Sequence, residues 1–156
     1  MAAKLDPENR AYEKALRLLT VRSRTRKELK QRLVAERFSE RVAEKVLDRL
    51  AGAGLIDDKK FAVDRARAMG KGKGWGPRKL RSDLLKKGIE NEAIDEAISQ
   101  AYGTQSATQV MKRLIKKRFG TQVLTQKADR KAKGKAQRFL LGRGFEPDEV
   151  SAMFDS

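Results

Sequence analysis

The residue types that most often carry out catalysis are largely missing from this chain. It contains no cysteine and no histidine, which removes thiol nucleophiles, disulfides, the usual zinc ligands and the commonest general base. Paired carboxylates occur at Asp57-Asp58 and at Asp95-Glu96. Each pair falls where a helix cap or a solvated helix face explains it, so neither predicts a two-carboxylate metal site. We therefore expect a protein that is not an enzyme, with no catalytic residue, no metal site and no cofactor.

A glycine-rich basic segment from Lys71 to Pro77 carries the single tryptophan, Trp75. A phosphate-binding loop would need a preceding strand and a glycine-lysine-serine or glycine-lysine-threonine order, and this segment has neither. The glycines are therefore interpreted as a connector between two helices. A lone tryptophan more often fills a core than stacks on a base, but the neighbouring Lys71 and Lys73 keep Trp75 a candidate contact.

Charge is the strongest signal in the composition. The 156 residues include 37 basic and 21 acidic side chains, which leaves a net charge of +16. Such an excess predicts a polyanionic partner: nucleic acid, a nucleoprotein or, less often, an anionic membrane surface. No apolar run approaches the roughly 20 residues that span a bilayer. The first residues also lack the order of a signal peptide, so we expect a cytoplasmic protein without a membrane anchor.

The positive charge is concentrated on one predicted helix, where five basic residues between positions 78 and 87 accompany the single acid Asp83. Positions 90 to 96 hold four acids and no base. A charge run usually marks a solvated face, but a surplus this concentrated favours a contact surface. The candidate contact residues are Lys71, Lys73, Trp75, Arg78, Lys79, Arg81, Lys86, Lys87, Arg26, Lys27, Lys30, Arg138 and Arg143.

The elements that must position these residues are helices, because the composition is rich in Ala, Leu, Lys, Arg and Glu. Thr25 and Glu28 have the spacing of a capping box, and the last third of the chain opens near Thr104 or Ser106. The other expected helix starts are Asp6-Pro7, Ser39, Asp57-Asp58, Pro77, Asn91 and Pro147.

The same apolar pattern occurs three times. Positions 29, 33 and 34 recur 51 residues later as 80, 84 and 85, and these recur 56 residues later as 136, 140 and 141. Thr25 and Gly76 fall at equivalent cap positions. The sequence therefore predicts an all-α fold of three tandem three-helix repeats, 1–54, 55–103 and 104–156, in an elongated, curved array. All members of each apolar stripe are expected to face the core.

Three short helices with basic residues also describe a helix-turn-helix domain. Tandem copies with acidic third helices do not suit insertion of a recognition helix into the major groove, so sequence-specific DNA recognition is not favoured.

Three segments at these spacings resemble the RecX family of bacterial regulatory proteins. They are the run from Gly54 to Ala62, the run from Lys73 to Ile89, and the run from Arg138 to Phe145. The likeness extends in order over nearly the whole chain. It is weakest at the first repeat, where the junction Arg37-Phe38-Ser39 is short and generic.

The resemblance implies three tandem three-helix units without catalytic residues, and a partner, the RecA recombinase filament on DNA. It implies a regulator, mainly an inhibitor, of recombinase, ATPase and coprotease activity in DNA repair, recombination and the SOS response. Some family members also bind single- or double-stranded DNA. Gly76, Pro77 and Arg138 are carried over as family positions with an architectural role. We expect a monomer. Charge alone leaves one alternative, a basic DNA-binding protein without sequence specificity that acts without RecA.

Overall fold

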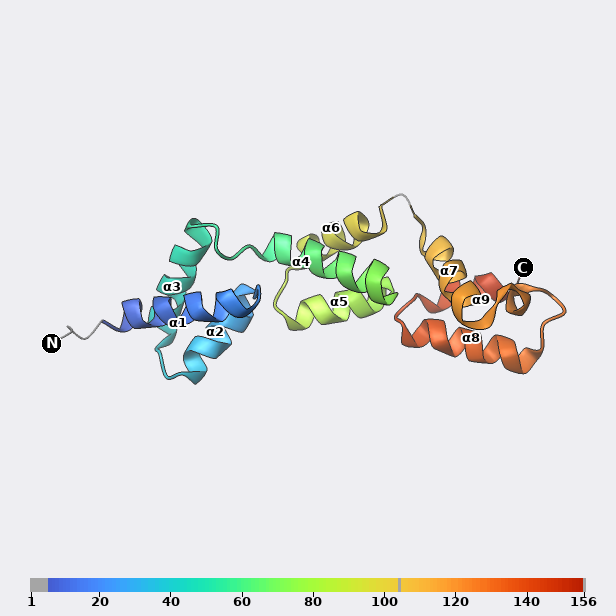
Figure 1. The fold of residues 1–156 in the computed structure, drawn as a ribbon, viewed down its shortest axis with the longest axis horizontal. Coiled ribbons are helices and arrows are strands. Elements are labelled where there is room, and N and C mark those ends of the chain that lie inside the picture. Colours follow the sequence, from blue (N-terminus) through green and yellow to red (C-terminus); the bar gives the residue numbers. More distant parts are fainter. Residues whose placement is uncertain (1–5, 104, 156) are drawn as a thin grey trace.

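The computed structural model describes residues 6–103 and 105–155, and within them every regular element is helical. The helices form three groups that follow one another in a row, with the two ends of the chain at opposite ends of the molecule (Figure 1). Each group has its own hydrophobic core. The predicted elongated all-α array of three three-helix units is therefore confirmed.

The first unit contains α1 (Pro7–Val21), α2 (Arg26–Ala35) and α3 (Glu40–Gly52). Each helix is capped by a side chain that accepts a hydrogen bond from the first turn, as predicted. The capping box at Thr25 is only half formed, because the Glu28 carboxylate lies 2.8 Å from the Arg22 guanidinium instead of reaching back to the cap. The buried core residues are Ala11, Ala15, Leu18, Leu29, Leu33, Ala43, Val46, Leu47, Leu50 and Ile56.

The second unit contains α4 (Asp58–Arg67), α5 (Pro77–Lys86) and α6 (Asn91–Tyr102). The expected connector between α4 and α5 is not a loose loop, since its first part continues α4 as a π-helix, η1 (Ala68–Gly72). The Trp75 amide donates to the Met69 carbonyl, and the Tyr102 hydroxyl donates to the Trp75 carbonyl. The buried core residues are Ala62, Ala66, Leu80, Leu84, Ile89, Ile94, Ala97 and Ala101.

The third unit contains α7 (Ala107–Phe119), a 3₁₀ turn η2 (Thr121–Leu124), α8 (Arg130–Gly142) and α9 (Pro147–Asp155). Ser106 caps α7 in a full capping box, while Thr104, the other expected start, lies outside the described residues. The buried core residues are Val110, Met111, Ile115, Val123, Ala136, Leu140, Phe145, Val150, Met153 and Phe154.

The units share residues at their borders. Ile56, placed by the sequence at the start of the second repeat, packs in the core of the first unit. Tyr102 packs against the cores of both the second and the third unit. The repeat boundaries 1–54, 55–103 and 104–156 therefore remain sequence predictions.

One expectation about the core is wrong. The last residue of each apolar stripe was expected to face inward, but Val34, Leu85 and Leu141 are 40%, 45% and 44% exposed. The residues directly before them, at positions 33, 84 and 140, are fully buried. Adjacent residues point about 100° apart around a helix, so a thin core on one side accommodates only one of each pair.

The turn that follows the second helix is the same in all three units. Residues Arg37, Gly88 and Gly144 occupy equivalent positions with positive φ angles of 71°, 82° and 89°. In each turn two backbone hydrogen bonds return to the helix end, as in a Schellman cap. The recurring turn presents carbonyl groups at the end of each second helix, and two of these turns contact the preceding unit.

Candidate functional site

The basic face predicted for function lies on α5. Leu80 and Leu84 are fully buried and fix the inner side of the helix. The opposite side contributes to an open groove of about 410 Å³ whose far wall is Glu146, from the third unit. The α5 residues that line it are Arg78, Arg81, Ser82, Leu85 and Lys86.

Two of the five basic residues of α5 and its C-cap are held by carboxylates of the same unit. Arg81 forms an ion pair with Asp95 of α6. Lys87 lies 3.5 Å from Asp83, which also accepts two hydrogen bonds from Arg65 of α4, at 2.9 and 3.1 Å. Arg78, Lys79 and Lys86 have no carboxylate partner within the described residues, and Lys79 packs against Trp75. Arg78 and Lys86 are therefore the most available cations of this face.

The Asp83 carboxyl is mostly buried, with 16% of its side chain exposed. Burial alone would raise the pKa of Asp83, but the hydrogen bonds from Arg65 and the charges of Arg65 and Lys87 outweigh it and lower that pKa below its ordinary value. The same hydrogen bonds raise the pKa of Arg65. This cluster joins α4 to α5 and acts as a structural ion pair.

The candidates of the first unit are also engaged. The Arg26 guanidinium donates to Glu44 at 2.6 Å and to Asp48 at 2.8 Å, and the Lys30 ammonium lies 2.9 Å from Glu44. Hydrogen bonds from Lys30 and Arg26 lower the pKa of Glu44, and the bond to Glu44 raises the pKa of Arg26. These pairs bind α2 to α3.

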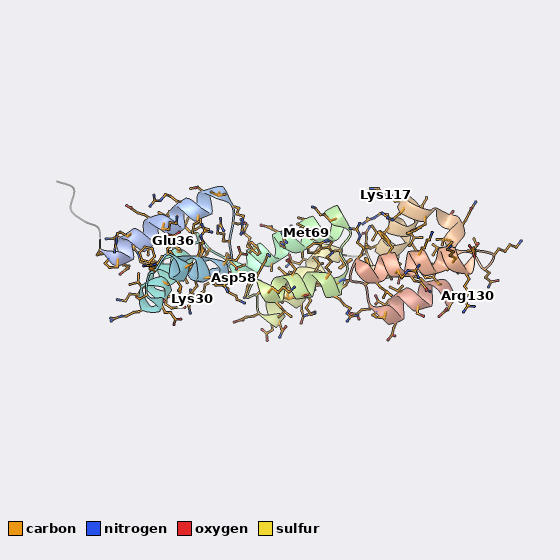
Figure 2. The ribbon with its side chains drawn as sticks, turned by 90° about the horizontal axis from the view of Figure 1, so that it is seen from below. Lys30, Glu36, Asp58, Met69, Lys117 and Arg130 are labelled. Atoms are coloured by element: carbon orange, nitrogen blue, oxygen red, sulfur yellow. The ribbon has the colours of Figure 1, made fainter. Side chains whose placement is uncertain are left out.

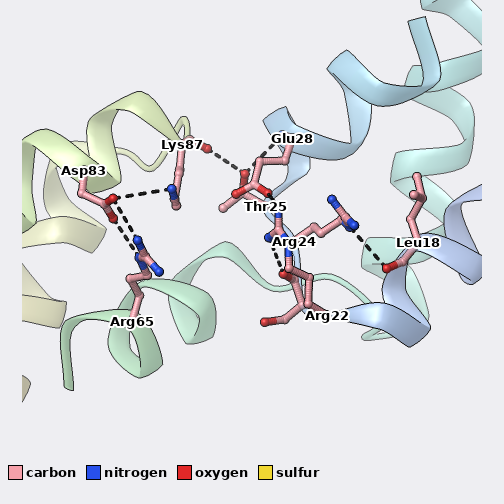
Figure 3. Close-up of polar contacts among 9 residues, drawn as sticks. Leu18, Arg22, Arg24, Thr25, Glu28, Arg65, Asp83 and Lys87 are labelled. Carbon is pink, nitrogen blue, oxygen red and sulfur yellow. Dashed lines mark hydrogen bonds and ion pairs between the residues drawn. The ribbon is translucent and has the colours of Figure 1, made fainter. Parts of the chain in front are cut away.

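The first and second units meet where α2 begins (Figure 3). Thr25, which is fully buried, donates its hydroxyl to the Lys87 carbonyl at 2.7 Å. The Arg26 amide donates to the Asp58 carboxylate at 2.9 Å, and Asp58 lies between the two units in Figure 2. The Lys27 ammonium reaches the Lys86 carbonyl at 3.2 Å. The start of α2 is therefore docked on the turn that follows α5.

The second and third units meet in the same way. The Gly76 amide donates to the Arg143 carbonyl at 2.6 Å, and the Arg78 amide donates to the Gly144 carbonyl at 2.9 Å. The Arg143 guanidinium returns a bond of 2.7 Å to the Lys73 carbonyl. A Cβ atom at Gly76 would lie 2.5 Å from the Gly144 carbonyl group, so this approach requires glycine. The start of α5 is docked on the turn after α8.

Trp75 lies beside this second junction and is half-buried. The Lys79 ammonium lies 4.7 Å and the Arg65 guanidinium 5.7 Å from the ring centroid. Packing against the core and two cations supports the core interpretation of Trp75. Lys71 and Lys73 are exposed nearby.

The candidates do not form one cluster. Arg138 is exposed on α8, and Arg143 lies 5.1 Å from the Phe139 ring. Sequence reasoning gave too little weight to the third unit, where side chains such as Lys117 and Arg130 point away from the helices (Figure 2). It also missed Asp58 and Arg65 as residues that hold units and helices together. The signal for Asp58 was its position at a predicted helix start, whereas Arg65 lies seven residues later, within α4.

In the part of the chain that the structure describes, no group of three or more acidic residues is placed to bind a metal ion. None of its helices has the length and apolar character that crossing a bilayer requires.

Comparison with known proteins gives one consistent family. The chain matches the first three-helix domain of RecX over residues 11–50, the second over residues 57–98 and the third over residues 108–153. These ranges agree with the three units of the structure and cover most of the chain.

Curated relatives carry the same name. Regulatory protein RecX of Mycolicibacterium smegmatis is 44% identical over 92 residues, which are 59% of this chain and 49% of that protein. Regulatory protein RecX of Mycobacterium leprae is 43% identical over 94 residues, which are 60% of this chain and 55% of that protein. The chain thus spans about half the length of the curated relatives it matches.

Solved structures agree as well. A crystal structure of regulatory protein RecX matches with a TM-score of 0.78 and 28% identity, over 97% of this chain and 73% of that chain. RecX from Lactobacillus salivarius matches with a TM-score of 0.78 and 24% identity, over 95% of this chain and 94% of that chain, which shows the shared fold. Three domain matches in order, on three units joined by the same kind of contact, confirm the predicted family: the chain belongs to the RecX family of regulatory proteins.

Proposed function

We propose that this protein binds the RecA nucleoprotein filament on DNA and inhibits its recombinase, ATPase and coprotease activities. The proposal rests first on its family, whose curated members are named regulatory proteins. The role has no requirement for catalysis by the chain itself. It requires a surface long enough to contact a repeating partner and a charge that complements it.

The observation that carries the proposal is the pair of equivalent junctions. Thr25 on the Lys87 carbonyl and Gly76 on the Arg143 carbonyl fix each unit to the next through buried or closely packed backbone contacts. The three units therefore form one extended body and are not independent domains on flexible linkers. Such a body is suited to lie across more than one protomer of a filament.

Bridging explains how binding would inhibit. A ligand that contacts neighbouring protomers in one conformation of the filament stabilises that conformation by its differential affinity. It would then resist the changes that accompany ATP turnover, or block the addition of further protomers. Because the contacts would be largely electrostatic, we expect filament binding to weaken markedly as salt is added.

A charge reversal on α5 tests whether its basic face makes the contact. Arg78 and Lys86 are the residues to change, because Arg81 and Lys87 hold Asp95 and Asp83 and their reversal would disturb the fold. We expect Arg78→Glu with Lys86→Glu to weaken co-sedimentation with RecA filaments about tenfold or more, by loss of complementary charge.

The matched control reverses two exposed cations on α1. Arg10→Glu with Arg17→Glu makes the same change in net charge, and neither residue forms an ion pair among the described residues. Equal binding by the α5 variant and this control, both folded, would show that the α5 face is not the contact surface.

One observation favours the second candidate, a DNA-binding protein without sequence specificity. Between residues 107 and 145 the sequence holds 12 basic residues and the single acid Asp129, and none of the ion pairs among the described residues involves any of them. The basic residues are Lys112, Arg113, Lys116, Lys117, Arg118, Lys127, Arg130, Lys131, Lys133, Lys135, Arg138 and Arg143. Unpaired surface cations of this density suit phosphate contacts.

Reversal of two exposed α7 residues separates the candidates. If DNA binding is the function, Lys116→Glu with Lys117→Glu lowers the affinity for bare DNA and any effect on RecA in parallel. If filament binding is direct, this variant still inhibits RecA while its affinity for bare DNA falls.

A further inference from the structure

Three exposed apolar side chains recur at equivalent positions. Val34, Leu85 and Leu141 are separated by 51 and 56 residues, the same separations that relate the buried stripe residues. Their exposed fractions are 40%, 45% and 44%. Each is the penultimate residue of the second helix of its unit. Because an apolar residue is exposed to the same degree in every repeat, we interpret it as a feature of the repeat and not as an isolated surface residue.

Folding does not require these three side chains. The core contacts of each second helix are made by the fully buried residues at positions 29, 33, 80, 84, 136 and 140. Among the residues that the structure describes, the two other large apolar residues that are exposed, Val21 at 76% and Leu55 at 46%, have no apolar counterpart exposed elsewhere in the repeats. Val34, Leu85 and Leu141 are thus the set of exposed apolar residues that the repeat preserves.

Cations flank each of the three residues on the same helix face. Positions four and seven residues earlier hold Lys30 and Lys27 before Val34, and Arg81 and Arg78 before Leu85. Arg138 lies three residues before Leu141. Residues at these spacings are neighbours on a helix surface. Lys30, Lys27 and Arg81 also make contacts within the fold, with Glu44, the Lys86 carbonyl and Asp95, whereas Arg78 and Arg138 have no ion-pair partner among the described residues. Each point therefore combines an apolar side chain with nearby cations, which are most available beside Leu85 and Leu141.

At the middle point, Leu85, the surface also forms a groove. Leu85 lines the groove of about 410 Å³ between α5 and Glu146, together with Arg78, Arg81 and Lys86. The groove gives an incoming apolar side chain a place beside Leu85, and Arg78 and Lys86, which have no carboxylate partner among the described residues, lie beside it to meet carboxylates.

The helices that carry the three points lie along one edge of the molecule. Helices α2, α5 and α8 follow one another along the same edge of the array in Figure 1. The two junctions fix their order, since the start of α2 docks on the turn after α5 and the start of α5 docks on the turn after α8.

We propose that Val34, Leu85 and Leu141, each with its flanking cations, form three equivalent docking points for a protein surface that presents an apolar side chain beside carboxylates at regular intervals. The inference rests on the proposed function, because a filament of identical protomers is a partner that repeats in this way. It adds the chemistry that each protomer would offer and the residues that would receive it.

The apolar row formed by Val34, Leu85 and Leu141 favours a protein over nucleic acid as the binding partner. Phosphate groups are met by cations and backbone amides, and an aliphatic side chain adds nothing to such contacts. When a protein surface covers an exposed leucine, removal of the leucine side chain from water stabilises the complex. The surrounding cations orient the partner and raise its rate of association. Regular spacing multiplies the effect, since the second and third contacts form within an already bound complex.

The test replaces the row with glutamine, a good helix former that keeps α2, α5 and α8 intact. Val34→Gln, Leu85→Gln and Leu141→Gln are combined in the full chain, and binding to RecA assembled on single-stranded DNA is measured by fluorescence anisotropy. The triple variant is expected to bind about tenfold or more weakly, as polar replacement at interface anchors commonly does. The matched control, Val21→Gln with Leu55→Gln, is expected to bind as wild type does.

The outcomes separate this inference from the function on which it rests. If the folded triple variant binds with wild-type affinity, the apolar row is not a docking surface, while filament binding itself still stands. A parallel loss of affinity for bare single-stranded DNA would identify the row as a nucleic-acid surface and also overturn it. Failure of the wild-type protein to bind RecA filaments would overturn the proposed function, and the row with it.

Discussion

Single glycines decide how closely neighbouring units approach. At Gly144 the φ angle is 89° and an added Cβ would lie 2.5 Å from the Lys79 amide nitrogen. Gly144→Ala combines backbone strain with this clash and is expected to destabilise the protein by about 1–3 kcal/mol. Thermal unfolding measures the loss, and hydrogen exchange at the Gly76 and Arg78 amides, which donate to this turn, is expected to speed up.

Gly142→Ala is the control for this prediction. Gly142 lies two residues away, at the end of α8, where an added Cβ would meet nothing within 4 Å. Alanine there is expected to be neutral or slightly stabilising, because it favours the helix. A Gly144→Ala protein as stable as the Gly142→Ala protein would contradict the packing described for the junction.

Asp83 makes stability depend on pH on the acid side. Because the pKa of Asp83 is lowered in the folded protein, its contribution is present above the ordinary carboxyl pKa of about 3.9 and is lost as the pH falls through the folded pKa. Asp83→Asn is expected to lower the free energy of unfolding by about 1–3 kcal/mol at neutral pH, by weakening the bonds from Arg65. Urea titrations at neutral pH and near pH 3 measure this.

The difference between the two proteins is expected to shrink as the pH falls toward 3, because the Asp83 carboxyl then binds a proton more readily in the unfolded chain than in the folded protein, where its pKa is lowered. Glu92→Gln removes an exposed carboxylate that has no ion-pair partner among the described residues, and it is the control expected to change little. A constant difference between wild type and Asp83→Asn at both pH values would argue against the ion pair as the cause.

The helices could largely be predicted from the sequence, because their caps and periodicity are local. Starts at Asp6-Pro7, Ser39, Pro77 and Pro147 are where the structure has them. The π-helical η1 was missed because glycines normally indicate a break, whereas here the Met69 carbonyl continues to accept a bond, from Trp75.

The contacts between units and the ion-pair partner of each basic residue could not be predicted from the sequence. Thr25 is 62 residues from the carbonyl of Lys87 that it contacts, and no local pattern records that pairing. Arg81 and Arg78 look alike in sequence, yet only Arg81 has a carboxylate from α6 beside it. The inward assignment of Leu85 failed for a related reason, since the thickness of a core depends on how the helices pack.

The turn after each second helix gives a prediction at the scale of elements. Arg37 adopts the positive φ angle that glycine adopts at the two equivalent turns, and its side chain is exposed. Arg37→Gly is expected to raise the free energy of unfolding by about 0.5–1 kcal/mol, since removal of left-handed strain outweighs the added flexibility of the unfolded chain. Arg37→Ala retains the Cβ and is expected to give no such gain; equal stabilisation by both would remove strain as the cause. Chemical denaturation measures both variants.

At the scale of the whole molecule, the junctions explain how the units are arranged, and the ion pairs explain how the positive charge is distributed. Each junction places the start of a second helix on the turn of the next unit, which produces a row instead of a compact cluster. Ion pairs use part of the positive charge of the first two units within the fold, while the third unit keeps its cations unpaired within the described residues. The net charge of +16 is therefore unevenly available to a partner.

The most direct measurement of the central claim follows ATP hydrolysis by RecA already assembled on single-stranded DNA, as this protein is added at low molar ratio. Because each bound molecule would hold more than one protomer, we expect inhibition when the protein is well below one copy per RecA, and a loss of inhibition as salt is raised. The same protein at the same concentration should leave most of the DNA uncovered when RecA is absent. Inhibition only at concentrations that coat the free DNA would contradict direct action on the filament.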